Sequence, residues 1–162
     1  MLRMNIRSIT RSMTMNALYV RVLSFAFLCG LVIVAMATAA ERDPLKPRVP
    51  EGDRAAAQKM KNPVAASADT LAKGKALYEG KGACIKCHGP SGAGDGPFGK
   101  NLKPSPRSLT NGEWQKSRAD GELFWIIKNG SPGTGMVSLI PSDINEDEAW
   151  HIINYVRTLD AK

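Results

Sequence analysis

The five residues Cys84-Ile85-Lys86-Cys87-His88 constrain this chain more than any other stretch. Two thiols three positions apart can each add to one vinyl group of the same porphyrin, and the histidine that follows then lies beneath the iron. Attachment and proximal ligation therefore come from five consecutive positions. The motif predicts that Cys84 and Cys87 hold one covalently attached haem c and that His88 is an iron ligand.

The same residues have two other known uses, a zinc knuckle and a redox dithiol. A zinc site needs further ligands, but the only other Cys and His residues are Cys29, which lies in a predicted targeting segment, and His151. A thioredoxin-like dithiol follows a buried strand, whereas a helical pattern precedes Cys84. We therefore favour haem attachment.

The formal net charge of +7 does not indicate a nucleic-acid-binding protein, because the excess charge lies at the start of the chain. Four arginines precede residue 22, and no acidic residue occurs before Glu41: Arg3, Arg7, Arg11 and Arg21. Without them the chain is mildly basic, with no arginine-rich arm and no interleaved aromatic and basic residues. We expect no nucleic-acid partner.

Residues 1–39 are predicted to be a signal peptide. A basic start leads into the apolar run 22–36, and the small residues that follow suit cleavage before Ala40. The run is shorter than the ~20 residues that span a membrane. An uncleaved N-terminal anchor stays open as an alternative, because the stretch up to Ala40 is almost uncharged. We expect a periplasmic or otherwise exported protein that is soluble after cleavage.

The rest of the chain divides into a flexible Pro-rich extension, residues 40–68, and a folded domain, residues 69–162. Four prolines interrupt any long helix in the extension, where only Arg54 to Lys61 suits a turn or two. A domain of this size buries little surface unaided, and a haem would supply a large apolar plate.

The domain is predicted to be all-α. One helix is expected over residues 71–79 and another over 119–129, and a third begins at Asn145 with Glu148 as its capping-box partner. His151 of the third helix is expected to point to solvent, away from an apolar face made by Ala149, Ile152, Ile153, Val156 and Leu159.

Met136 is the candidate for the second axial ligand. It is the one methionine among residues 61–162, and it ends the Gly-rich stretch 129–136, which suits a tight loop. A buried methionine is generally more often a packing residue than a ligand. The preceding haem motif reverses that preference, so His88 and Met136 are the predicted metal ligands.

Four features follow one another in the chain: a helix with Gly74 and Tyr78, the motif ending in His88, the sequence Gly-Thr-Gly-Met136, and a helix with Tyr155. With these features in this order, the chain resembles a class I c-type cytochrome of the monohaem, bacterial exported type. The resemblance covers about residues 62–159. It implies a small fold of three to four helices wrapped around one haem c, with long loops.

The resemblance also implies contacts and roles for single residues. The first and last helices should cross where Gly74 and Tyr78 meet Ile152 and Tyr155. The carbonyl of Pro97 should accept a hydrogen bond from the proximal histidine. Val137 departs from the pattern, since proline frequently follows the ligating methionine in the family.

The function that the resemblance implies is one-electron transfer between redox partner proteins on a His/Met-ligated haem. Such a protein is not an enzyme, has no small-molecule substrate and depends on haem-attachment machinery. One alternative is a haem subunit tethered to a membrane respiratory complex. Another is a haem enzyme or ligand sensor in which the sixth site is open and Met136 merely packs.

Lysines surround the haem motif and the loop that follows it, and one ends the helix before the Met136 loop: Lys81, Lys86, Lys100, Lys103 and Lys128. The acidic residues Glu146, Asp147 and Glu148 gather instead at the start of the last helix. This distribution predicts that lysines orient an exposed haem edge toward an acidic partner. Ordinary solvated lysines are the alternative.

Overall fold

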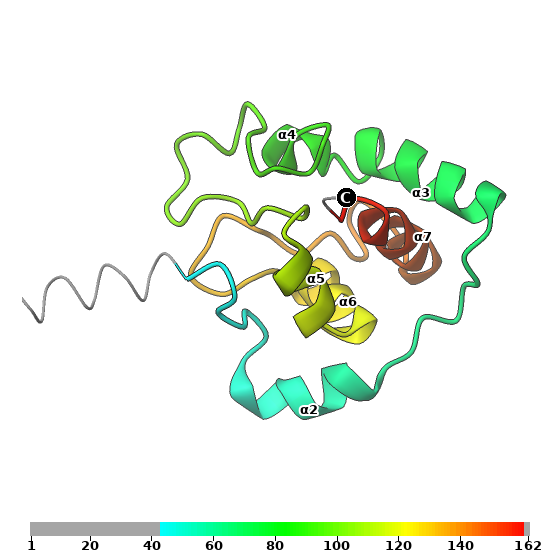
Figure 1. Cartoon of the computed structure of the whole chain (residues 1–162), viewed down its shortest axis with the longest axis horizontal. Helices are drawn as coiled ribbons and strands as arrows, with labels where there is room; N and C mark the ends of the chain where they lie inside the picture. Colours follow the sequence, from blue (N-terminus) through cyan, green and yellow to red (C-terminus); the bar gives the residue numbers. More distant parts are fainter. Residues whose placement is uncertain (1–42, 161–162) are drawn as a thin grey trace, which may run out of the picture. The chain divides into compact units, whose positions relative to one another are not determined.

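The structure, a computed structural model, describes residues 43–160, within which six helices form (Figure 1). They are α2 Glu51–Lys59, α3 Ala68–Glu79, α4 Ile85–His88, α5 Gly112–Ser117, α6 Asp120–Asn129 and α7 Glu146–Arg157. These described residues contain no strand, which confirms the all-α prediction. The predicted signal peptide and its cleavage site lie outside them. None of the described helices has the length and apolar character needed to cross a membrane.

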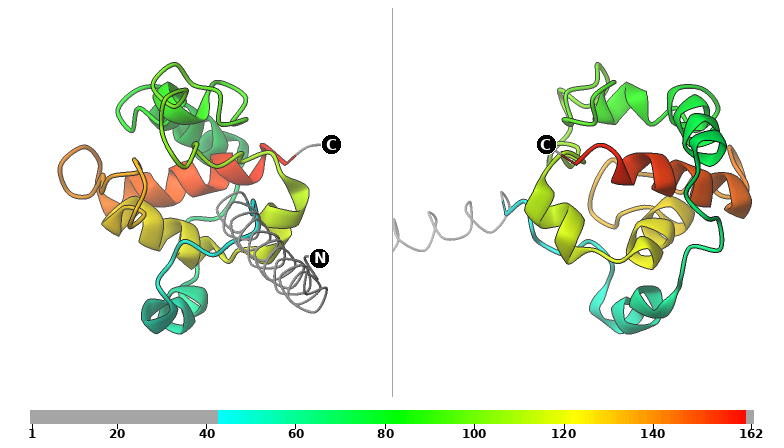
Figure 2. Two further views of the ribbon diagram at one scale, coloured as in Figure 1. Left: turned by 90° about the vertical axis from the view of Figure 1, so that its left-hand side faces the viewer. Right: turned by 45° about the vertical axis from the view of Figure 1, so that its right-hand side comes forward.

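The larger helices pack in the order α2, α6, α7, α3, as the views in Figure 2 show. α7 therefore has neighbours on two sides, and its residues Ala149, Ile152 and Ile153 are almost completely buried. Phe124 of α6 stacks on Trp150 of α7 with 4.2 Å between ring centroids. The core is thus built around α7.

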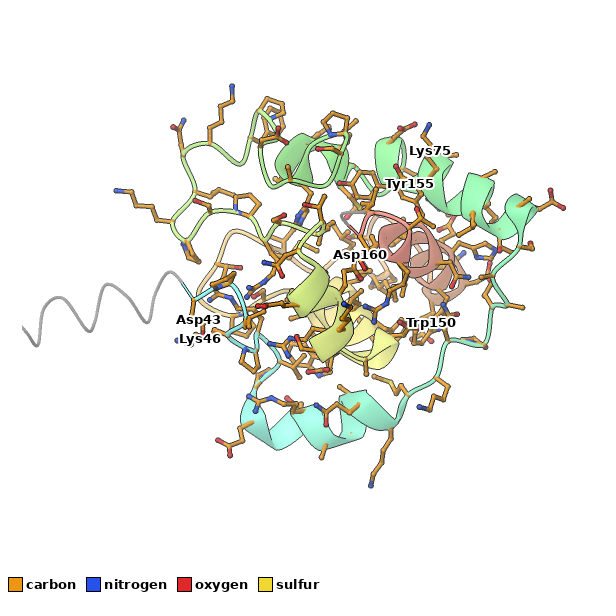
Figure 3. All side chains as sticks on the ribbon, in the orientation of Figure 1. Asp43, Lys46, Lys75, Trp150, Tyr155 and Asp160 are labelled. Atoms are coloured by element: carbon orange, nitrogen blue, oxygen red, sulfur yellow. The ribbon has the colours of Figure 1, made fainter. Side chains whose placement is uncertain are left out.

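α3 and α7 cross at Gly74. A Cβ atom at this position would collide with the backbone carbonyl of His151 and lie 3.0 Å from Cβ of Tyr155. One turn further along α3, the buried ring of Tyr78 meets Tyr155 edge-on, with 5.3 Å between centroids. Figure 3 shows where Tyr155 lies. These contacts confirm the predicted crossing for Gly74, Tyr78 and Tyr155, while Ile152 lies against Gly82, just beyond α3. They explain why α3 tolerates the helix-propensity cost of a glycine.

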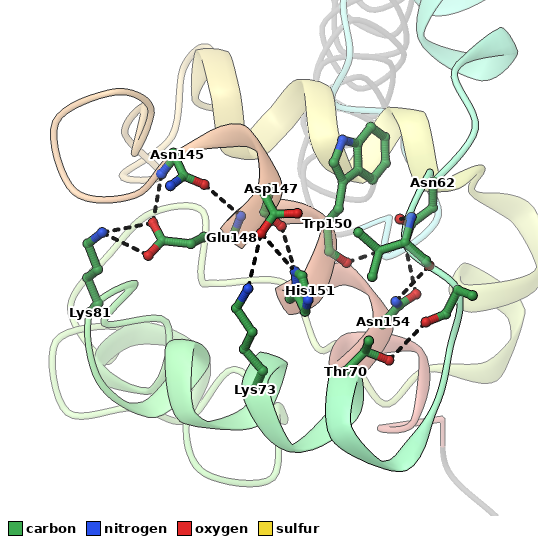
Figure 4. A network of polar contacts seen from close by, with 12 residues as sticks. Asn62, Thr70, Lys73, Lys81, Asn145, Asp147, Glu148, Trp150, His151 and Asn154 are labelled. Carbon is green, nitrogen blue, oxygen red and sulfur yellow. Dashed lines mark hydrogen bonds and ion pairs between the residues drawn. The ribbon is translucent and has the colours of Figure 1, made fainter.

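His151 is buried, so its predicted solvent exposure is wrong. Its exposed fraction is 7%, and its Nδ1 lies 2.8 Å from the carbonyl oxygen of Asp147 (Figure 4). The prediction assumed a single buried face, whereas α6 covers one side of α7 and α3 covers another. Trp150 is buried against Phe124 of α6, and Asn154 is buried beside Asn62 and Val64.

Residues 44–64, here called the N-terminal arm, pack on the domain and so differ from the flexible extension predicted from their composition. Val49 and Ala57 are 3% and 1% exposed, and α2 runs against α6. At the end of the arm, Asn62 Nδ2 donates to Asn154 Oδ1 at 2.8 Å (Figure 4). The arm is polar on average, but a few buried apolar side chains are enough to pack it against the domain.

The starts of the helices follow local capping. The Asn145 side chain accepts from the backbone N–H of Glu148, whose carboxylate accepts from the N–H of Asn145, and this confirms the predicted capping box. α3 begins earlier than predicted because Ser67 and Thr70 form a similar box. The short helix α5 was not predicted.

We expect Gly74→Ala to lower the free energy of unfolding by roughly 1–3 kcal/mol, the usual cost of overpacking a core. The added methyl group has no space beside the His151 carbonyl. Gly52→Ala is the matched control, because nothing lies within 4 Å of a Cβ atom at that helical position. Better helix propensity should there raise stability by up to about 1 kcal/mol. Chemical denaturation measures both variants, and a neutral Gly74→Ala would contradict the close helix contact.

Candidate functional site

α4 presents the two cysteines of the motif on one side. Cys84 has helical backbone angles (φ −59°, ψ −36°) directly before Ile85, so Cys84 and Cys87 are one turn apart. Both are free thiols. Burial raises the pKa of the Cys84 thiol to about 12, which suppresses the thiolate that a redox dithiol needs. The arrangement suits two thioether bonds to one macrocycle better than dithiol chemistry.

The zinc interpretation gains no support from the structure. Within residues 43–160, no three His, Cys, Asp or Glu side chains converge in the way that a metal site made by protein ligands alone requires. His151 lies on α7, where its Nδ1 is engaged with the Asp147 carbonyl.

The His88 imidazole is oriented by the backbone of a loop distant in sequence. Its Nδ1 lies 2.9 Å from the carbonyl oxygen of Arg107. Because a carbonyl only accepts, Nδ1 carries the proton and Nε2 keeps its lone pair. Burial lowers the pKa of His88, an effect that this hydrogen bond partly opposes. The ring is therefore neutral near pH 7, with the tautomer that an iron ligand bound through Nε2 requires.

The acceptor of this hydrogen bond is Arg107, which corrects the expectation that it would be Pro97. The loop containing Pro97 folds back on the carbonyl end of α4, where the N–H of Gly96 donates to the Cys87 carbonyl at 3.1 Å. Arg107 carried no signal in the sequence, because every residue offers a backbone carbonyl and only the folded loop selects one.

The four-residue helix α4 depends on its neighbours for its position. A Cβ atom at Gly96 would lie 2.5 Å from the Lys86 carbonyl oxygen, so a glycine is needed for the loop to close on the helix. From α3, the Tyr78 hydroxyl donates to the Gly89 carbonyl at 2.7 Å. Burial raises the pKa of Tyr78, so the donor proton is retained. α3 and the loop hold α4 between them.

The loop that carries Met136 is closed by its own hydrogen bonds. The Met136 N–H donates to the Thr134 hydroxyl at 3.1 Å, and the Met136 carbonyl accepts from the Ser131 N–H at 2.8 Å. The Thr134 hydroxyl in turn donates to the Ser131 carbonyl at 2.8 Å. Leu102, in the loop after the haem motif, lies against Gly135. The segments that follow His88 and precede Met136 are thus in contact.

Two helices crossing at a glycine, with a C-x-x-C-H helix held against them, define a c-type cytochrome domain. The chain fits a haem by three features of its own residues. Two free thiols lie on one side of a helix, and a neutral imidazole keeps Nε2 available. The two cysteines and the histidine are all partly buried.

Comparison with known proteins agrees with this class. Residues 69–156 match the family described as cytochrome C oxidase, cbb3-type, subunit III, and the chain belongs to this family. A solved chain of the Kuenenia stuttgartiensis reducing HAO-like protein complex is similar, at 28% sequence identity and a TM-score of 0.55. The similarity covers 62% of this chain and 49% of the other, so it spans about half of that relative. No curated protein matches the chain.

These findings confirm the predicted class, fold and cofactor. The protein is a class I c-type cytochrome with an all-α fold, and its cofactor is covalently attached haem c with iron. The family further indicates a role in electron transfer.

We expect both cysteines to carry a thioether bond. Acid–acetone extraction should leave the haem colour with the wild-type protein and remove it from the Cys84→Ser/Cys87→Ser double variant. Mass spectrometry should show one added haem group, and Lys86→Gln, between the two cysteines, should behave as wild type. Extractable haem in the wild type would contradict attachment at these residues.

Proposed function

We propose that the protein carries one electron at a time between redox partner proteins, with His88 and Met136 as axial ligands of its haem. The observation that carries the proposal is the His88 imidazole, which the Arg107 carbonyl fixes with Nε2 available. When bound, the haem supplies a one-electron ferric/ferrous couple. The residues of the chain hold it, orient its ligands and exclude water.

Met136 is suited to its proposed role by the way its loop is held. The family pattern would place a proline at position 137, and this chain has Val137. Hydrogen bonds from Ser131 and to Thr134 fix the Met136 backbone on both sides and can supply the missing rigidity. A thioether ligand favours ferrous iron and raises the reduction potential. With both axial positions closed, no substrate reaches the iron, so we propose no enzymatic activity.

We expect Met136→Ala to open the sixth iron position. The far-red absorption band of the ferric protein should vanish, carbon monoxide should bind the ferrous form, and the reduction potential should fall. Met60→Ala is the matched control, because Met60 is the other methionine of the described chain and lies just after α2. The ligand assignment is wrong if His151→Ala has these effects and Met136→Ala does not.

The proposed partner surface is narrower than the sequence suggested. Lys81 pairs with Glu148 at 2.8 Å (Figure 4) and Lys128 with Glu146 at 2.7 Å, so the acidic cluster of α7 faces two of the lysines instead of standing apart from them. The hydrogen bond from Lys81 also lowers the pKa of Glu148.

The lysines that remain as docking candidates are Lys86, Lys100 and Lys103, all exposed. Phe98, 66% exposed, lies in the loop after the haem motif, with the Lys86 ammonium 5.8 Å from its ring centroid. Val137, also 66% exposed, follows Met136. An exposed aromatic side chain beside a lysine suits a transient partner that is acidic around an apolar contact.

We expect the bimolecular electron-transfer rate with the native partner to fall as ionic strength rises, because salt screens these charges over about 10 Å. Replacing Lys86 and Lys103 with Gln should slow the reaction at low salt. Lys73→Gln is the control, since Lys73 pairs with Asp147 across the α3–α7 contact. A rate that is flat or rises with salt would exclude lysine-guided docking.

A second candidate function is that of a haem subunit in a larger redox assembly. The matching family is described as an oxidase subunit, and the similar solved chain comes from a protein complex. The native mass of the haem-bearing species, measured in gentle membrane and soluble extracts, separates a subunit from a free carrier.

We also propose that the protein is exported and receives its haem outside the cytoplasm from dedicated attachment machinery. The supports are the covalent haem and the leader-like composition of residues 1–39. N-terminal sequencing that begins at Ala40 agrees with cleavage, whereas a full-length chain in membranes favours the anchored alternative.

A further inference from the structure

Arg107 joins the proximal histidine to the N-terminal arm. Its backbone carbonyl accepts from His88 Nδ1 at 2.9 Å, and its guanidinium Nη2 donates to the Lys46 carbonyl at 2.8 Å. Lys46 lies at the beginning of the arm (Figure 3). The residue that orients His88 is therefore itself fastened to a segment far away in the sequence.

The loop containing Arg107 has no regular secondary structure to fix its carbonyl. Residues 89–110 contain no helix, so no ladder of regular hydrogen bonds sets their course. The Leu109 N–H donates to the Gly92 carbonyl at 2.6 Å, and Gly94 packs against the Pro106 carbonyl. The position of the Arg107 carbonyl thus depends on irregular contacts. Leu109 is buried and its carbonyl accepts from Gln115, Pro106 packs against Gly99, and the Arg107 side chain adds the bond to the arm.

The arm offers a firm anchor because it is fastened along its length. Arg118 Nη2 donates to the Leu45 carbonyl near the start of the arm, and Asn62 Nδ2 donates to Asn154 Oδ1 at 2.8 Å near its end. The Val49 side chain is 3% exposed. Arg118 and Arg107 thus bond to the carbonyls of two consecutive arm residues. Further along the arm, α2 packs against α6.

We propose that the N-terminal arm positions the His88 imidazole through Arg107, which makes Arg107 a positioning residue for the axial ligand. The inference rests on the proposed function in one respect, that His88 is that ligand. A hydrogen bond from the second ring nitrogen fixes the orientation of a ligating imidazole and its basicity. Loss of the arm contact frees the Arg107 carbonyl to move and weakens the bond to His88.

The test follows the His88 Nδ1 proton in the reduced, haem-loaded, full-length protein by NMR. In Arg107→Gln we expect this proton to exchange roughly fivefold faster, the factor that matches about 1 kcal/mol, the net value of one typical hydrogen bond. Arg107→Lys keeps the charge and a donor and should restore most of the protection. Arg48→Gln also removes one positive charge, in this case from the arm, and should leave the exchange of the His88 Nδ1 proton unchanged.

Val49→Ala tests the arm without touching Arg107 or any charge. We expect faster exchange in the same direction but by a smaller factor, together with a more positive reduction potential. The potential rises because a more weakly bonded imidazole is a poorer donor to ferric iron. If Arg107→Gln does not accumulate with haem, Val49→Ala still tests whether the arm positions His88.

Unchanged exchange in Arg107→Gln overturns the positioning role, as does an equal increase in Arg48→Gln. Unchanged exchange in Val49→Ala overturns the part assigned to the arm. Failure of the proposed function has a different signature, because the wild-type protein would then lack a His88 resonance shifted by the haem and the spectrum of a His/Met-ligated iron.

Discussion

The backbone contact between α3 and α7 at Gly74 is the constraint on which the haem site depends. It brings the two helices close enough for Tyr78 and Tyr155 to pack edge to face, and it directs the end of α3 toward α4. From there the Tyr78 hydroxyl reaches the Gly89 carbonyl, next to His88. A helix of only four residues, such as α4, has little stability of its own. Its position therefore depends on this crossing.

The two proposed axial ligands are held by different physical means. His88 lies on α4, and its ring is turned by a carbonyl from a loop without helices. Met136 lies in a loop closed by hydrogen bonds of Ser131 and Thr134. In both cases the groups that do the holding are largely backbone atoms. Substitution of many side chains can therefore leave such a site intact, provided that the loops keep their course.

The lysines of this domain fall into two groups. Lys73, Lys81 and Lys128 pair with the acidic first turn of α7 and link it to other elements, although such exposed pairs each contribute little stability. Lys86, Lys100 and Lys103 lie instead around the loop that follows the haem motif. Counting charges along the sequence cannot separate these groups, because pairing depends on which side chains the fold brings within reach.

The cofactor chemistry and three of the larger helices, α3, α6 and α7, follow from local sequence patterns. The C-x-x-C-H spacing is local, so cofactor and class could be predicted from five residues, and the box at Asn145 placed the start of α7. Tertiary structure decided what depends on contacts between distant segments. It buried His151 between helices, docked a polar arm through Val49 and Ala57, and selected the Arg107 carbonyl over that of Pro97. A backbone acceptor leaves no mark in residue identity, and the burial of one residue depends on every element packed around it.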